Sequence, residues 1–143
     1  TGLDPHARHL LWDRIRTLRG QGRSVLITTH YMDEAQRLCD AIAVIDHGRI
    51  LAVDTPANLI TQTVGDDVVE IETTGDAAVL GEVRAALGQG LTVEVHGPVV
   101  LGFGHDGEAA TALLGRPGVI SVTRRRANLE DVFLRLAGRE LRQ

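Results

Sequence analysis

The chain has 143 residues, of which 43% are hydrophobic, and a formal net charge of -4 at pH 7. This length suffices to bury the core of one domain or of two small ones. The acidic balance argues against a nucleic-acid partner, because nucleic-acid-binding proteins usually carry excess positive charge. Cys39, the single cysteine, cannot form an intramolecular disulfide, and no signal peptide or long apolar run appears, which favours a cytoplasmic setting without direct membrane insertion.

The first part of the sequence mixes helical and strand-like segments. A helix is predicted from Asp4 to about Gln21, because Asp4 suits the N-cap and Pro5 suits the first helical position. The β-branched run Ser24–Thr29 predicts a strand covered on both faces, as in a parallel sheet. A short helix (33–40), a second covered strand (41–46), a tight turn, a return strand (49–54) and a short helix (55–61) follow.

The pattern changes after residue 65, where apolar and polar residues alternate. The alternation over 67–73 and 91–97 predicts strands with one face in a core and the other toward solvent or a partner. The remaining segments predict a helix (76–87), a hairpin strand (99–104), a second helix (106–115), a fourth strand (118–126) and a last helix (127–141). This is the split βαβ, ferredoxin-like order, with helices on one face of an antiparallel sheet. We therefore predict an α/β chain with a domain boundary near 62–66, which separates residues 1–63 from residues 66–143.

Three short motifs near the start of the chain are informative because of their order. They are "TGLDP", "SVLITTH" and "DEA". Together they resemble the second half of an ATP-binding cassette (ABC) ATPase, with a D-loop at Gly2, Leu3 and Asp4 and an H-loop, or switch histidine, at His30. In that family the magnesium-ligating aspartate and the catalytic glutamate precede the D-loop, so the resemblance implies that the chain begins within a domain.

The remainder of the chain extends this resemblance. The segment "GRILAVDTPANL" is similar to the stretch that follows the H-loop in such ATPases, and "ANLEDVFLRLAGREL" is similar to the C-terminal extension of the drug-resistance and daunorubicin-export type. The implied fold is the C-terminal half of a P-loop NTPase sheet followed by a small α+β, ferredoxin-like accessory domain with a terminal helix.

The resemblance also implies a role for each matched residue. His30, at the carboxyl end of a sheet strand, would hydrogen-bond the γ-phosphate of ATP and align the attacking water, which makes it the candidate catalytic and ATP-contacting residue. Asp4 would lie at the interface with a second ATPase subunit in a homodimer. The parent protein would use ATP and Mg2+ to drive efflux of a drug-like or lipid-like solute through a separate membrane permease, from the inner face of the cell membrane.

Several parts of an ATPase site are missing from these 143 residues. Every one of the 15 basic residues is arginine, so the lysine of a P-loop of the form G-x-x-x-x-G-K-[ST] is absent. The signature motif, the glutamine loop and the acidic strand end are absent as well. We therefore expect that this chain alone neither hydrolyses ATP nor binds it tightly, although the parent protein, an ABC-type translocase, does both.

Other interpretations of the same residues stay open. Asp4 also suits an N-cap, and Asp33 and Glu34 fit helix starters better than metal ligands, so no metal site is expected. The run Arg124–Arg126 resembles a phosphate clamp, but alternating faces along a strand favour a solvated edge. The chain also fits a non-transport ABC ATPase, or a stand-alone regulatory or dimerisation module without ATPase activity.

Overall fold

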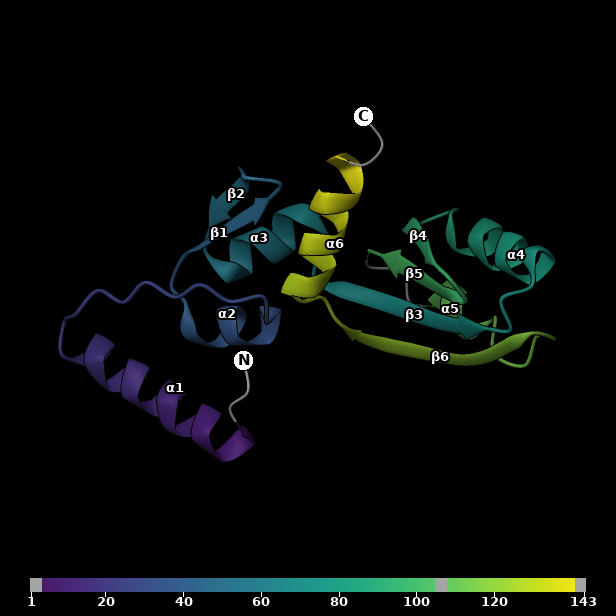
Figure 1. Ribbon diagram of the computed structural model, residues 1–143. Coiled ribbons are helices and arrows are strands. Elements are labelled where there is room, and N and C mark those ends of the chain that lie inside the picture. The colour runs from purple at the N-terminus through teal and green to yellow at the C-terminus, as the bar shows by residue number, and fades with distance from the viewer. Residues whose placement is uncertain (1–3, 105–107, 141–143) are drawn as a thin grey trace. The chain divides into compact units, whose positions relative to one another are not determined.

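The computed structural model describes residues 4–104 and 108–140 and forms two compact units, Thr1–Pro56 and Ala57–Gln143 (Figure 1). The first unit holds α1 (Pro5–Gly20), α2 (Met32–Leu38), β1 (Ile42–Asp46) and β2 (Arg49–Asp54). The junction carries α3 (Pro56–Thr63), and the second unit continues with β3 (Asp67–Thr73), α4 (Ala77–Leu87), β4 (Thr92–His96), β5 (Val99–Phe103), α5 (Glu108–Thr111), β6 (Val119–Arg126) and α6 (Leu129–Glu140). Both sheets are antiparallel, and the mixed α/β class is the predicted one.

None of the helices in the described part of the chain combines the length and the apolar character needed to cross a membrane.

The first helix begins where its sequence predicts. Asp4 Oδ1 accepts a hydrogen bond from the Ala7 amide at 2.8 Å, and Pro5 occupies the first turn. On the inner face of α1, Trp12 and Ile15 are buried and pack against α2. These two side chains and Leu38 of α2 form the small core of the first unit, and the predicted helix is confirmed.

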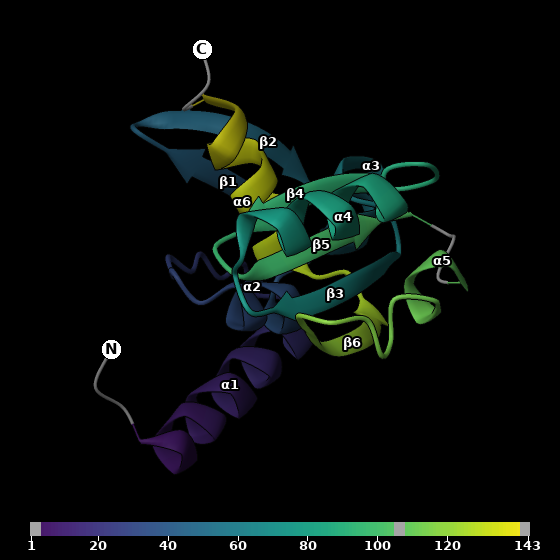
Figure 2. The same ribbon diagram turned by 90° about the vertical axis from the view of Figure 1, so that its right-hand side faces the viewer.

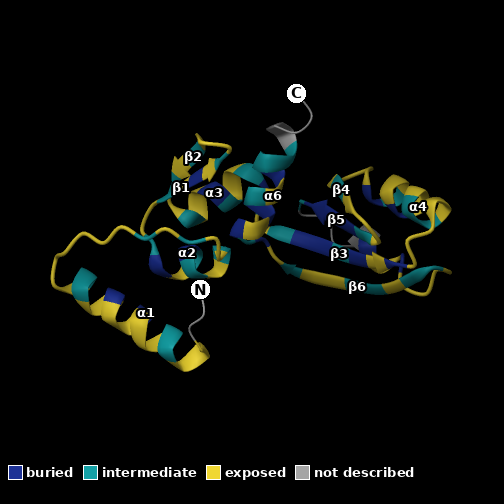
Figure 3. Cartoon of the chain, in the orientation of Figure 1, coloured by how far each residue is buried: buried dark blue, intermediate teal, exposed yellow. Residues whose placement is uncertain are grey.

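The predicted strand over Ser24–Thr29 is wrong, because the segment is irregular and largely exposed (Figure 3). Leu26 is 97% exposed, whereas Ile27 packs against the core of α1 and α2. A strand requires a hydrogen-bonded neighbour, and among the described residues none pairs with this segment. Its β-branched residues favour a strand, but a strand forms only where a neighbouring strand is present to pair with it.

The two strands β1 and β2 form a hairpin around the predicted turn. His47 and Gly48 have φ of 44° and 74°, the positive values that a two-residue hairpin turn favours. The return strand is confirmed, but β1 is not covered on both faces: Val44 is buried while Ile45 is 59% exposed. With two strands and no further strand paired to them in the described chain, one apolar side of the hairpin meets solvent.

The second unit is built on a four-stranded antiparallel sheet in the order β4-β5-β3-β6. The central strand β3 pairs with β5 on one side and with β6 on the other, and β4 pairs with the far side of β5. Since α4 connects β3 to β4 and β5 lies between them, the βαβ unit is split as the sequence predicts.

One face of this sheet is covered by α4 and by the α5 segment (Figure 2). Val69 and Ile71 of β3 lie on that face together with Val100 of β5, and they pack with Val83 of α4. Of the predicted helix 106–115, residues 106–107 lie outside the described residues. The helix α5 ends at Thr111 rather than at 115, where turns lead into the sequence Gly-Arg-Pro, which stops a helix.

The opposite face, expected to meet solvent or a partner, is covered by α6 at the end that holds Val68, whereas Glu72 and His96 on the same face are exposed as expected. Val68 of β3 is fully buried there, and Leu129 and Val132 of α6 are buried as well. The ferredoxin-like order predicts helices on one face of the sheet. The helix α6 follows the elements of that order in the chain and packs on the other face. Two arginines attach α6 to this second face, one through the buried Asp131 and the other through the half-buried Glu94.

Arg125 of β6 forms the first of these attachments. Its guanidinium donates two hydrogen bonds of 2.8 Å to the Asp131 carboxylate and one of 3.1 Å to Glu70. Asp131 is 3% exposed and exchanges hydrogen bonds with Asn128 in a capping box at the start of α6. The hydrogen bond to Asp131 raises the pKa of the Arg125 guanidinium. The expected alternation along the arginine run is confirmed, but Arg125 is engaged in pairs rather than solvated.

Arg135 forms the second attachment and is 8% exposed. Its Nε donates to Glu94 of β4 at 2.7 Å, and its Nη1 donates to the Thr63 carbonyl at the end of α3 at 2.9 Å. The guanidinium also lies over the Phe103 ring, 4.2 Å from the ring centre. One side chain of α6 therefore connects two strands and the end of α3.

Candidate functional site

Of the three predicted D-loop residues, Gly2 and Leu3 lie outside the described part of the chain. Asp4 is described and exposed, with an extended backbone (φ -66°, ψ 163°) that directs the following residues into α1. Its Oδ1 is used by the helix cap, and the Arg8 amide donates to its carbonyl at 3.0 Å. The capping role of Asp4 is confirmed, and its place at a subunit interface stays a prediction.

His30 lies at the turn that leads from the irregular segment into α2, so it does not end a strand as predicted. It is exposed, and its ring centre lies 4.2 Å from that of Tyr31. Thr29 shapes this turn, because its Oγ1 accepts a hydrogen bond from the Tyr31 amide at 3.0 Å. The residues on both sides of His30 are therefore held while the imidazole itself faces solvent.

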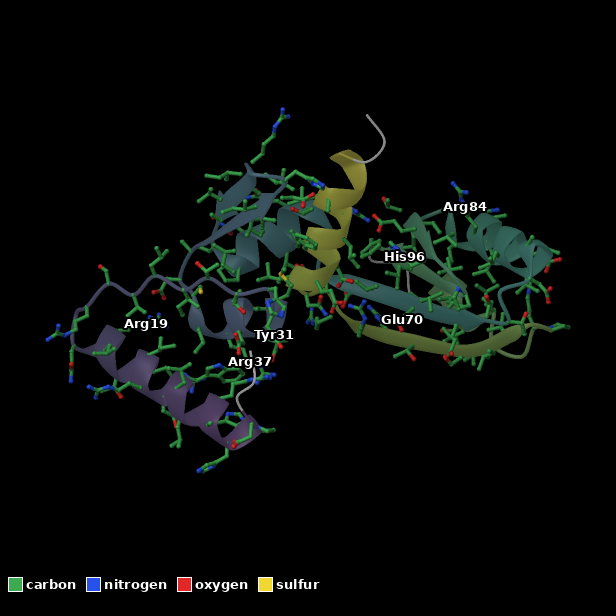
Figure 4. All side chains as sticks on the ribbon, viewed as in Figure 1. Arg19, Tyr31, Arg37, Glu70, Arg84 and His96 are labelled. Carbon is green, nitrogen blue, oxygen red and sulfur yellow. The ribbon has the colours of Figure 1, made fainter. Side chains whose placement is uncertain are left out.

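Glu34 lies one turn further on and connects this turn to α1. Its Oε2 accepts a 2.9 Å hydrogen bond from Thr29 Oγ1, and its Oε1 lies 3.6 Å from Arg8 Nε. The Arg8 guanidinium also lies over the Tyr31 ring, 5.1 Å from its centre, and Tyr31 projects from the start of α2 (Figure 4). Glu34 and its neighbour do begin α2, as predicted, but the contacts of Glu34 with Thr29 and Arg8 were not predicted. A threonine five residues before a glutamate was the one available signal.

A second set of contacts fixes α1 against the other end of α2. Arg19 donates to the Leu38 carbonyl at 2.8 Å and pairs with Asp40. A depression of about 510 Å³ at this end of α1 is lined mainly by arginine and glycine. Arg19, which lines this depression, is committed to the Leu38 carbonyl and to Asp40, and it therefore helps to hold the two helices together.

The residues present fit a nucleotide only in part. The two ring nitrogens of the exposed His30 can contact a phosphate oxygen. No lysine and no glycine-rich phosphate-binding loop accompany this histidine in the sequence. Within residues 4–104 and 108–140, no three His, Cys, Asp or Glu side chains gather closely enough to hold a metal ion. The described residues therefore include one candidate phosphate contact, and the role of His30 in an ATP site stays a prediction.

Comparison with known proteins gives this arrangement a context. Residues 77–138 match the family described as nodulation factor export protein NodI, C-terminal domain. Over 142 residues, 99% of this chain, the sequence is 48% identical to the Nod factor export ATP-binding protein I of Burkholderia orbicola, of which it covers 45%. The chain is similar in sequence to part of the Nod factor export ATP-binding proteins.

Two further relatives of the same name give a similar result. The protein from Ralstonia nicotianae is 45% identical over 149 aligned residues, and that from Sinorhizobium fredii is 46% identical over 143. Each alignment includes 99% of this chain, which covers 45% of the first protein and 40% of the second. The chain thus spans less than half the length of these relatives.

These names confirm the coarser prediction from the motifs, namely a relationship to the ATP-binding component of an export system. The narrower prediction of a drug-resistance type stays a prediction. The family match lies in the second unit, apart from the D-loop and H-loop segments, so it supports the relationship independently of them.

Proposed function

We propose that this chain is the C-terminal part of the ATP-hydrolysing subunit of a bacterial ABC exporter. The observation that carries the proposal is the 48% identity, over 99% of the chain, to a protein named for ATP binding and for export. The D-loop and H-loop motifs support it, because both motifs belong to the second half of an ABC ATPase, the half that this chain resembles.

In this proposal His30 is the catalytic residue of the chain. Its exposed imidazole donates a hydrogen bond to the γ-phosphate of ATP and positions the attacking water. Mg2+ accompanies the nucleotide and takes its ligands from residues that this chain lacks. Asp4, with Gly2 and Leu3, contacts the second subunit of a homodimer, and the isolated chain neither hydrolyses ATP nor binds it tightly.

The proposed assembly places the ATPase at the cytoplasmic face of the membrane, held there by a separate permease. Hydrolysis drives export of a drug-like solute, a lipid-like solute or a molecule of the Nod factor kind named for the relatives. Residues 1–63 belong to the nucleotide-binding domain, and residues 66–143 form an accessory domain that supplies a dimerisation or regulatory surface.

The experiment begins with the natural gene product that contains this chain. We expect an intact mass about twice 15.4 kDa, given the proportion of the relatives that the chain covers. We expect this product to hydrolyse ATP and the His30→Ala variant to lose about 100-fold or more in turnover, the usual loss when one stabilising donor is removed. His47→Asn, in the exposed hairpin turn, should retain the activity of the parent.

Two results would overturn this proposal. One is a natural product of 15.4 kDa, the mass of this chain. The other is equal ATP turnover in the His30→Ala variant and the parent. The first would favour the alternative of a regulatory module without ATPase activity, for which the self-contained core of the second unit is the supporting observation. The second would remove His30 from the catalytic machinery.

A further inference from the structure

Four side chains of the first unit form a continuous set of contacts around His30. Thr29 and Tyr31 flank the histidine, Glu34 binds Thr29, and Arg8 of α1 contacts both Glu34 and the Tyr31 ring. Three of the four lie in the segment 29–34, and Arg8 comes from a helix more than twenty positions earlier in the chain. The set therefore joins the turn of the predicted H-loop to the helix that the predicted D-loop begins.

The hydroxyl of Thr29 has a defined orientation in this arrangement. A hydroxyl carries one proton, and an ionised carboxylate can only accept, so the proton of Oγ1 points to Glu34. A lone pair of the same oxygen then faces the Tyr31 amide, which donates to it at 3.0 Å. Glu34 thereby fixes the rotation of the hydroxyl, and the hydroxyl fixes the backbone that carries His30.

Arg8 extends this connection to the start of α1. Its amide donates to the Asp4 carbonyl in the first turn, while its guanidinium lies near Glu34 and over Tyr31. The Glu34 side chain is 18% exposed and that of Arg8 is 35% exposed, so the pair is partly shielded from water. A shift of the Asp4 turn would move Arg8 and, through it, the residues on either side of His30.

We propose that Thr29, Glu34 and Arg8 are positioning residues that hold His30 in the orientation needed for ATP turnover and tie that orientation to the D-loop helix. This inference rests on the proposed function for its effect on turnover, but its structural part concerns this chain alone. The three residues touch neither nucleotide nor water in the reaction; they act through the backbone and the ring of the neighbouring Tyr31.

The structural test uses the 143-residue chain and a matched pair of variants at position 29. Thr29→Val keeps the shape but removes the hydroxyl, whereas Thr29→Ser keeps the hydroxyl. We expect the Tyr31 amide to exchange with deuterium about fivefold faster in Thr29→Val, because one hydrogen bond of ordinary strength is lost. Thr29→Ser should retain the exchange rate of the parent. Equal exchange in all three proteins would overturn the proposal.

The second structural pair separates the hydrogen bond of Glu34 from its charge. Glu34→Gln retains an oxygen that can accept from Thr29 but weakens the contact with Arg8, and Glu34→Ala removes both. We expect slow Tyr31 exchange to survive in Glu34→Gln and to be lost in Glu34→Ala. Asp13→Asn, which breaks the exposed pair with Arg16 on α1, is the control and should change nothing at Tyr31.

The functional test uses the natural gene product. A small displacement of a catalytic group lowers the rate of the chemical step more than it lowers the affinity for substrate. We therefore expect Thr29→Val to lower kcat for ATP about tenfold with KM little changed. Thr29→Ser should restore kcat to near the parent value. A Thr29→Val variant with raised KM and unchanged kcat would overturn the proposal, since that is the signature of weakened binding.

The two tests also separate the failure of this inference from the failure of the proposed function. If the natural product has no ATPase activity, the proposed function fails, while the exchange of the Tyr31 amide still decides whether Glu34 and Thr29 hold the turn. If the product is an ATPase and Thr29→Val leaves the exchange rate of the Tyr31 amide unchanged, the proposed function stands. The positioning role of Thr29, Glu34 and Arg8 is then refuted.

Discussion

The two units of this chain differ in how fully each buries its own apolar residues. In the second unit, helices pack on both faces of the sheet, and Val68, Ile71 and Val100 have no exposed surface. In the first unit, a small core around Trp12 lies beside an irregular segment and a hairpin whose outer face is apolar and exposed. Figure 3 shows the contrast between the dark central strands of the second unit and the exposed segment that precedes α2.

This contrast teaches that strand-like composition and strand formation are separate properties. The segment Ser24–Thr29 and the strand β3 are both rich in β-branched residues, but β3 has a hydrogen-bonded neighbour on each side. Where neighbouring strands are present, a β-branched segment forms a buried strand. Where none is present among the described residues, the apolar side chains of such a segment stay exposed.

The largest expected effect comes from the same substitution placed in each unit. Ile71→Ala removes a fully buried side chain and should lower the free energy of unfolding of the second unit by about 3 kcal/mol. Ile45→Ala, at a site that is 59% exposed, should lower that of the first unit by less than about 1 kcal/mol. Urea unfolding is followed by Trp12 fluorescence for the first unit and by amide exchange in β3 for the second.

The two probes are specific because Trp12 is the single tryptophan and belongs to the core of the first unit. Equal losses for the two variants would mean that the difference in burial between the units does not decide their stability. Loss of the Trp12 transition in Ile71→Ala would show instead that the two units unfold together.

A second comparison concerns the buried ion pairs that hold α6. Asp131→Ala leaves Arg125 without its main partner and removes half of a capping box, and it should cost the second unit about 3 kcal/mol. Asp67→Ala breaks a pair with Arg124, whose side chain is 60% exposed, and should cost less than about 1 kcal/mol. Similar midpoints of urea unfolding for the two variants would contradict this ranking.

A third comparison concerns two glycines of the second unit. Gly118 has a φ of 84°, and a Cβ there would lie 2.5 Å from Val79 Cγ2, so Gly118→Ala should destabilise by about 2 kcal/mol. Gly81 is inside α4 with nothing within 4 Å of an added Cβ, so Gly81→Ala should stabilise by about 1 kcal/mol. Thermal unfolding followed by circular dichroism measures both, and shifts of the same sign would refute the argument.

Local signals in the sequence were enough to predict most of the fold. Asp4 with Pro5 marked the start of α1, His47-Gly48 marked the hairpin turn, and alternation after residue 65 led to the strand order of the second unit. These features depend on residues close together in the chain. The covering of the second sheet face by α6 was not predicted, because it depends on Arg125 and Arg135 meeting acids on other elements.

The candidate site was predictable to a similar extent. His30 and Asp4 follow from motif order, but the contacts of Arg8 with Glu34 and Tyr31 require α1 and α2 to be packed together. Pairs distant in sequence have no periodic pattern, so a single sequence does not indicate them. The predicted strand before His30 failed for the same reason, since sheet pairing is a property of the neighbours as much as of the segment.

The smallest expected effect concerns Cys39, which follows α2 in the first unit. Burial raises the pKa of its thiol above the ordinary value of 9.0, with Arg19 acting in the opposite direction and Asp40 in the same one. A raised pKa in the folded state means that the folded chain keeps a proton that the unfolded chain has lost. This contribution to stability is complete below pH 9 and declines as the pH rises through the folded pKa. Urea midpoints from Trp12 fluorescence should therefore fall more steeply above pH 9 in the parent chain than in Cys39→Ala, and parallel curves would contradict the burial of this thiol.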